Sequence, residues 1–225
     1  MAGVTCQSFG FGMAMLAAPL LALVDPVLVP VPLLMLTSAH SVMAVARDGR
    51  HADWRGVGWA MLGRLPGTGL GVLAVILLPQ RVFALFIGVC VLAFVALSVL
   101  TWQPRPQPRS LVIAGVASGV GGTAASIGGP PLALLYQGSS GPAVRGTLSA
   151  YFVLGSVTSI AALAAAGQVT REALSAAAVL APFLLGGFLL SGPARGVLDA
   201  GRIRTAVLSV AATSAVLLIG RSVLM

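Results

Sequence analysis

The chain has 225 residues, of which 58% are hydrophobic and only 8% are charged. A soluble domain carries about a quarter charged residues, so this composition excludes a protein whose whole surface faces water. The net charge of +8 comes from thirteen arginines, with no lysine, against five acidic residues. In a soluble protein that balance would indicate nucleic-acid binding, but arginines that flank apolar segments set membrane orientation instead. The composition predicts an all-α polytopic membrane protein that does not bind nucleic acid.

Eight apolar segments follow one another along the chain, and several are long enough to cross a bilayer, which takes about 20 residues. Short breaks rich in glycine, proline and polar residues separate them. Because no basic residue precedes the first apolar run, we do not expect a cleaved signal peptide. In chain order the segments are 1–24, 27–46, 57–78, 82–102, 111–137, 143–166, 173–190 and 205–224.

The two halves of the chain resemble each other. Moving the first half forward by 116 positions places Pro26 on Pro142 and Pro66 on Pro182 without a gap. Transporters are often built from such internal repeats. The proline-rich stretch QPRPQPRS lies between the halves and has the composition of a linker. We therefore predict two repeats of four segments, 1–102 and 111–225, joined by a linker at 103–110.

The arginines discriminate between two topologies. If all eight segments cross the membrane, seven arginines fall on one side and five on the other. If the first and fifth segments instead enter and leave on the same side as broken hairpins, the division becomes nine against three. The larger group is then Arg47, Arg50, Arg55, Arg105, Arg109, Arg145, Arg195, Arg202 and Arg204, and the smaller is Arg81, Arg171 and Arg221. The positive-inside rule favours the second arrangement, which gives each repeat three full crossings, inverts one repeat relative to the other and places both termini outside the cytoplasm.

Helix-breaking residues interrupt the fifth segment at GGTAASIGGPP. In lipid, unwound backbone is tolerated only where protein buries it or where it lines an aqueous cavity. Pro130 is suited to begin a second half-helix, because proline favours the first turn. The amides near Gly128 and Gly129 would then lie at a positive helix end that suits a small anion, with hydroxyls from Thr123 and Ser126 as further donors. Close helix packing is the alternative role for these glycines, and it accounts well for a spacing of four residues but poorly for GGPP.

The repeat predicts a weaker copy of this break in the first half, around Gly10 and Gly12 in SFGFGMAM. Polar residues also lie within the following membrane segments. His40 and Ser38 fall near the middle of the second segment, and Ser156 falls at the position that matches His40 in the repeat. An ionisable side chain inside a membrane indicates function, so His40 is a candidate anion donor or carrier of a coupled proton, or else a packed, hydrogen-bonded histidine.

Arg64, in MLGRLPGTGLG, lies several residues inside the third segment. The simpler interpretation is that its side chain snorkels to the membrane surface, and the alternative is that it adds positive charge to an anion path. The sequence shows no phosphate-binding loop, no paired carboxylates and no nucleophile with a base, so we expect neither an enzyme nor a cofactor. Cys6 and Cys90 lie in apolar sequence without ligand spacing, so we expect no metal site.

The fifth and sixth segments, GVASGVGGTAASIGGPPLALL followed by GPAVRGTLSAYFVLGSVTSI, resemble the second half of the TauE/SafE sulfite exporter family, also called toluene-sulfonate uptake permeases. FGFGMAMLAAPLLALVDPVLVPVPLL and RHADWRG resemble the corresponding first half. Gly128, Gly129 and Pro130 match the second break of that family by position, and Gly10 and Gly12 match the first. The chain departs from the family pattern because its first break lacks consecutive glycines.

The resemblance implies a secondary transporter of a small sulfur-containing anion, such as sulfite or an organosulfonate, across the inner membrane. Export is the direction that it implies, and the membrane potential or a proton gradient would drive it. An anion channel and a carboxylate transporter on the same fold are the alternatives. The sequence leaves the specific anion, the coupling ion and assembly into a homo-oligomer open.

Overall fold

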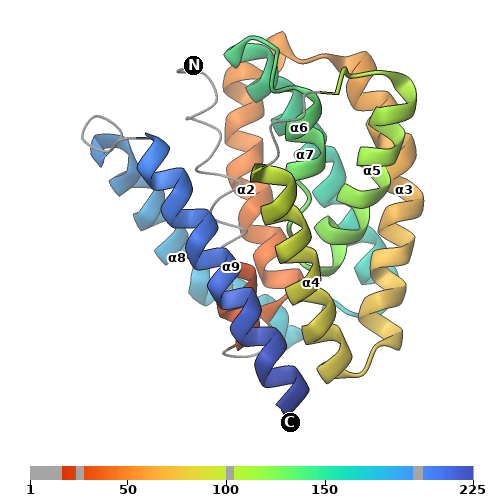
Figure 1. Ribbon diagram of the computed structural model, residues 1–225, viewed down its shortest axis with the longest axis vertical. Helices are drawn as coiled ribbons and strands as arrows, with labels where there is room; N and C mark the ends of the chain where they lie inside the picture. The colour runs from red at the N-terminus through yellow and green to blue at the C-terminus, as the bar shows by residue number, and fades with distance from the viewer. Residues whose placement is uncertain (1–16, 24–27, 100–103, 195–199, 225) are drawn as a thin grey trace.

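Helices make up the regular structure of this computed structural model, which describes residues 17–23, 28–99, 104–194 and 200–224. Within these ranges the side chains at 40, 47, 183–194, 200–204 and 223–224 are not described. Residues 17–23 are helical, and a short 3₁₀ turn, Gly49–His51, follows α2. The other helices are α2 Val31–Asp48, α3 Trp54–Leu77, α4 Gln80–Val99, α5 Pro108–Ala124, α6 Pro130–Leu135, α7 Gly141–Ala165, α8 Arg171–Ala194 and α9 Ala200–Leu224 (Figure 1).

Each predicted segment from the second to the eighth contains a helix. Four described stretches are long and apolar enough to cross a membrane: Trp54–Leu77, Gln80–Val99, Gly141–Ala165 and Thr205–Ser222. The fifth segment is broken as predicted, into α5 and α6. Its first helix begins at Pro108 rather than at the expected position 111, because Gln107 and Ser110 form a reciprocal capping box there. The first segment lies outside the described residues up to position 16.

Helices α3 and α5 run parallel and in close contact. A methyl group added at Gly63 or Gly67 of α3 would overlap the backbone of α5 at Val112 or Val116. Because both contacts advance by four residues on each helix, the two helices point the same way (Figure 1). Glycine permits this approach, which is the packing mode of small residues at membrane helix interfaces. The spacing of four residues at Gly115 and Gly119 has the same use, as the packing interpretation predicted.

The fifth segment forms a hairpin that enters and returns at one end of the molecule. Residues 125–129 are not helical, and the chain reverses there. After α6, Tyr136 donates a hydrogen bond of 2.8 Å to Oδ2 of Asp53. Asp53 is the N-cap of α3, where its Oδ1 accepts from the backbone N–H of Gly56 at 3.0 Å. Since α5 starts beside the first turns of α3 and Tyr136 ends beside its N-cap, both ends of the hairpin lie at the same level.

Helices α2 and α7 are antiparallel neighbours. Asp48, the last residue of α2, pairs with Arg145 near the start of α7 at 2.9 Å. At the other ends of these helices, Val31 packs in one cluster with Leu163 and with Ala173 of α8. Helix α8 therefore begins at the end of the bundle where α7 finishes.

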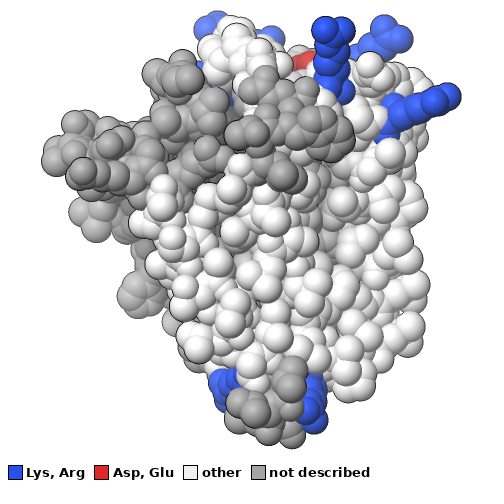
Figure 2. All heavy atoms as spheres, in the orientation of Figure 1, with Lys and Arg blue, Asp and Glu red and all other residues white. Residues whose placement is uncertain are grey.

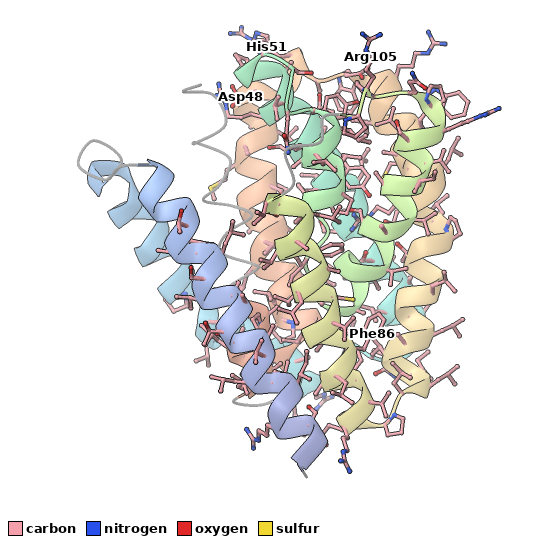
Figure 3. The ribbon with its side chains drawn as sticks, in the orientation of Figure 1. Asp48, His51, Phe86 and Arg105 are labelled. Atoms are coloured by element: carbon pink, nitrogen blue, oxygen red, sulfur yellow. The ribbon has the colours of Figure 1, made fainter. Side chains whose placement is uncertain are left out.

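The charged side chains lie at the two ends of the bundle. Figure 2 shows them at both ends, with uncharged surface between them on the visible face. Figure 3 places Asp48, His51 and Arg105 at one end, which we call the arginine-rich end. At the opposite end Arg81 of α4 donates to the backbone oxygen of Ser222 at 2.5 Å, and Arg221 donates to that of Leu23 at 2.6 Å. An apolar band between two charged ends is what a bilayer requires.

Candidate functional site

Among the described residues, Arg64 is the only buried charged side chain, with 2% of its surface exposed. It lies near the middle of α3, inside a stretch long enough to span the membrane. The interpretation that it snorkels to the surface is therefore wrong. Two neighbours account for this: Gly119 brings the backbone of α5 against Arg64, and the ring of Tyr151 on α7 covers the guanidinium, with its centroid 4.9 Å from Cζ. The side chain points into the bundle instead of along its surface.

The guanidinium reaches one hydroxyl on each of two neighbouring helices. Its Nη1 donates to Ser118 Oγ of α5 at 3.4 Å, and its Nη2 donates to Ser159 Oγ of α7 at 3.3 Å. Hydrogen bonds from a guanidinium to a charged acceptor are about 2.7–2.9 Å long. These two contacts are therefore long and weak for a full positive charge.

The hydroxyls around Arg64 connect it to the helix break. Ser159 Oγ and Thr123 Oγ1 share a hydrogen bond of 2.8 Å, and Ser118 donates to the backbone oxygen of Gly128. A hydroxyl has one donor and two acceptor positions and rotates to suit its partner. This small network can therefore turn its donors toward a bound anion.

Two glycines shape the space around the guanidinium. A methyl group at Gly155 of α7 would overlap the Arg64 guanidinium, and one at Gly122 of α5 would lie 3.1 Å from its Nη2. The same position at Gly122 is 3.5 Å from the Cα of Gly128. The charged end of Arg64 thus lies directly against the break between α5 and α6.

Three buried polar atoms in this region have no hydrogen-bond partner within the described part of the chain: Nε of Arg64, Oγ1 of Thr68 and the hydroxyl of Tyr151. Thr68 lies one turn beyond Arg64 on the same face of α3, and Tyr151 stacks on the guanidinium. Buried polar groups are normally paired, so a cluster of unpaired ones indicates a bound ion or water. The positive charge of Arg64 makes this cluster most suited to an anion.

No described carboxylate neutralises Arg64. Asp48 pairs with Arg145, Asp53 caps α3 and accepts from Tyr136, and Glu172 lies in the first turn of α8. Burying a charge without a partner costs several kcal/mol, and arginine does not lose its proton in proteins. Within the described part of the chain, the charge of Arg64 is balanced only by neutral hydroxyls and an aromatic ring.

Of the predicted site residues, Thr123 and Gly128 lie in this network. Gly129 is the N-cap of α6 and Pro130 is its first residue. Helix α6 has only six residues, and neither Pro130 nor Pro131 has an N–H group. The guanidinium is therefore a larger source of positive charge at the break than the helix end on which the sequence prediction relied.

Three other predicted residues bond elsewhere in the described conformation. Ser126, with a φ of 60°, donates to the backbone oxygen of Pro30 at 3.0 Å, which joins the break to the start of α2. Ser156 donates to Val153 within α7, and Ser38 donates to Leu34 within α2. Gly10, Gly12 and the side chain of His40 lie outside the described residues.

Sequence reasoning did not identify Ser118, Ser159, Thr68, Tyr151 or Gly155. Ser159 lies one helical turn after the predicted Ser156, and it is Ser159 that faces Arg64. The repeated glycines of α3, which place α5 over Arg64, were the available signal for a buried arginine. The described residues contain no group of three or more His, Cys, Asp or Glu that could hold a metal ion.

The hydroxyl–guanidinium arrangement fits an anion, and comparison with known proteins identifies the family of the chain. Neither a curated protein nor a solved structure gives a significant match. The family model described as sulfite exporter TauE/SafE matches residues 1–218, which is nearly the whole chain. This protein therefore belongs to the TauE/SafE family of membrane transporters.

Proposed function

We propose that the protein is a secondary transporter that exports a small sulfur-containing anion, such as sulfite or an organosulfonate, across the inner membrane. The single observation that carries the proposal is the buried guanidinium of Arg64, which has no carboxylate partner among the described residues and lies against the break between α5 and α6. A family of sulfite exporters supplies the class of substrate. The geometry supplies a site within a membrane-spanning bundle where such an anion would be stabilised.

Alternating access suits the burial of this region. All residues from 121 to 132 are buried, as is Arg64, so an anion reaches the guanidinium only after helices separate. Two inverted repeats that move against each other would open the site to one side and then to the other. The opposite directions of α2 and α7 support this arrangement, and so do the equal lengths of α3 and α8, each of 24 residues. Helix α3 starts at the arginine-rich end and α8 at the other, which also supports an inverted arrangement.

Flux measurements on protein reconstituted in liposomes test the transport function. We expect sulfite efflux that saturates with concentration, and we expect Arg64→Gln to reduce it at least about 100-fold, because loss of the cation leaves a buried anion unpaired. The matched control is Arg105→Gln, an exposed arginine at the end of the molecule, which should keep wild-type flux. Flux that rises linearly without saturation would indicate a channel, and wild-type flux in Arg64→Gln would remove this arginine from the site.

Reporter fusions test the inverted topology. A reporter on the C-terminus should read as non-cytoplasmic, because the arginine-rich end is expected to face the cytoplasm and α9 runs from that end to the other. A reporter inserted after Arg105, at the arginine-rich end, should read as cytoplasmic and serves as the control. A cytoplasmic C-terminus would contradict the paired-hairpin arrangement.

A further inference from the structure

We infer that the site at Arg64 selects an anion by its charge and takes a compact oxyanion with one negative charge, such as hydrogensulfite or a small sulfonate, in preference to a dianion such as sulfite or sulfate. The inference rests on the proposed transport function, because it concerns the anion that the same site carries. Three features of the described residues support it: the number of charges around the guanidinium, the burial of the site and the arrangement of its donors.

Among the described residues, the site at Arg64 contains one cation and no anion. Three described helices surround the guanidinium, and on α3 the buried hydroxyl of Thr68 lies one turn beyond Arg64. Helix α5 contributes the hydroxyls of Ser118 and Thr123, and α7 contributes Ser159 with the ring of Tyr151. Of the described side chains that face Arg64, Tyr151 is the only other titratable one. Neither a second arginine nor a carboxylate faces this group among the side chains that the structure describes.

Because the site is buried, its single positive charge favours an anion with a single negative charge. A monoanion beside Arg64 forms a neutral pair, whereas a dianion leaves one negative charge uncompensated in a water-poor interior. Charge interactions are several times stronger there than in water, and an uncompensated buried charge is correspondingly costly. Since Arg64 is 2% exposed, solvent does little to offset the second charge. We expect a dianion of the same size to bind at least about 10-fold more weakly than a monoanion.

The donors match a head group with three oxygens. Nη1 and Nη2 of Arg64 form a planar fork, and three hydroxyls, from Ser118, Thr123 and Ser159, lie around it. Gly122 and Gly155 leave no room for a bulky substituent beside the guanidinium. A sulfonate head or hydrogensulfite offers oxygens to all of these groups, and a small methyl substituent can point away from the fork.

A preference for monoanions makes the binding of sulfite depend on pH. Sulfite takes up a proton near neutral pH and becomes hydrogensulfite, so the preferred species brings its own proton into the site. The affinity for total sulfite should then fall as the pH rises and the dianion replaces the monoanion. Methanesulfonate stays a monoanion across this range, and its affinity should not change. A comparison of sulfite with methanesulfonate therefore distinguishes titration of the ligand from titration of the protein.

The test is calorimetric titration of the purified full-length protein at constant ionic strength. We expect methanesulfonate to bind at least about 10-fold more tightly than sulfate at neutral pH. We also expect sulfite affinity to fall between pH 6 and pH 8.5 in step with the fraction of hydrogensulfite, while methanesulfonate affinity stays constant. Sulfate binding as tight as methanesulfonate binding, or sulfite affinity that rises with pH, would overturn the inference.

Both comparisons use wild-type protein, so they test the inference even if a variant fails to fold. The variant Arg64→Lys tests whether the anion binds at Arg64. It keeps the positive charge, so it should retain the preference for methanesulfonate over sulfate. It should bind both anions more weakly, because lysine lacks the planar fork of the guanidinium. Loss of the preference in Arg64→Lys with the exposed control Arg105→Lys unchanged would show that charge alone does not set it, which contradicts the inference. Selective binding without any liposome flux would defeat the proposed transport function only, and sulfate flux that saturates at the same concentration as methanesulfonate flux would defeat the charge selection only.

Discussion

The middle of the bundle and its arginine-rich end use the same helices in opposite ways. At the end, Asp48 pairs with Arg145 between α2 and α7, and Asp53 joins α3 to Tyr136 after α6. Each of these carboxylates has a short, well-formed contact. In the middle, where α3, α5 and α7 meet, the described hydrogen bonds of Arg64 are two long contacts to hydroxyls, and the ring of Tyr151 covers its guanidinium.

Under the proposed function, the difference separates structural charges from a functional one. A paired charge at a helix end holds helices together and needs nothing further. The unpaired cation in the middle destabilises the bundle unless a ligand joins it, and such cost is typical of binding and transport sites. Burial of Tyr136, followed by its hydrogen bond to Asp53 and the charge of that carboxylate, raises the pKa of its hydroxyl. The tyrosine therefore stays protonated and keeps donating at the arginine-rich end.

After Arg64→Gln, the largest effect on sulfite flux is expected from a single methyl group in the middle. Gly155→Ala would place that methyl in the space of the Arg64 guanidinium and force the side chain to move. Overpacking of this kind costs about 1–3 kcal/mol, so sulfite flux should fall about 10- to 100-fold while the protein still inserts in the membrane. Gly69→Ala on α3 is the matched control, since a methyl there meets no atom within 4 Å. Equal flux in the two variants would show that the position of Arg64 does not govern transport.

The sequence predicted the helices, the broken fifth segment and the glycines of the break, because lipid imposes strong rules on length and on backbone hydrogen bonding. It did not predict that Arg64 is buried. Snorkelling depends on what lies beside an arginine, and here Gly119 of α5 and Tyr151 of α7 cover it from segments distant in the chain. Ser159 was missed for a related reason, since the repeat register indicates a position but not which face of α7 meets α3.

An intermediate effect is expected at the arginine-rich end from Asp53→Ala. The variant loses the N-cap contact to Gly56 and leaves the buried hydroxyl of Tyr136 without its acceptor. Loss of a cap costs about 1 kcal/mol, and an unsatisfied buried group costs about 1–3 kcal/mol, so the free energy of unfolding should fall by about 2 kcal/mol or more. Denaturation in mixed detergent micelles measures it. Tyr136→Phe removes only the donor of that bond, leaves Oδ2 of the exposed Asp53 to water and keeps the cap, so it should cost less than Asp53→Ala. The reverse order would contradict the assignment of Asp53 as a structural charge.

The smallest effect is expected from the ion pair between Asp48 and Arg145. Its side chains are 14% and 27% exposed, so solvent screens their attraction, and a pair of this kind contributes about 0–1 kcal/mol. A double-mutant cycle with Asp48→Asn and Arg145→Gln should give a coupling free energy in that range, and the coupling should shrink further in high salt. Sulfite flux should change less than in Gly155→Ala. Either a coupling free energy above about 2 kcal/mol or a loss of flux as large as that of Gly155→Ala would contradict this division of roles. The ion pair at the arginine-rich end would then affect the anion site as strongly as the residues of that site do.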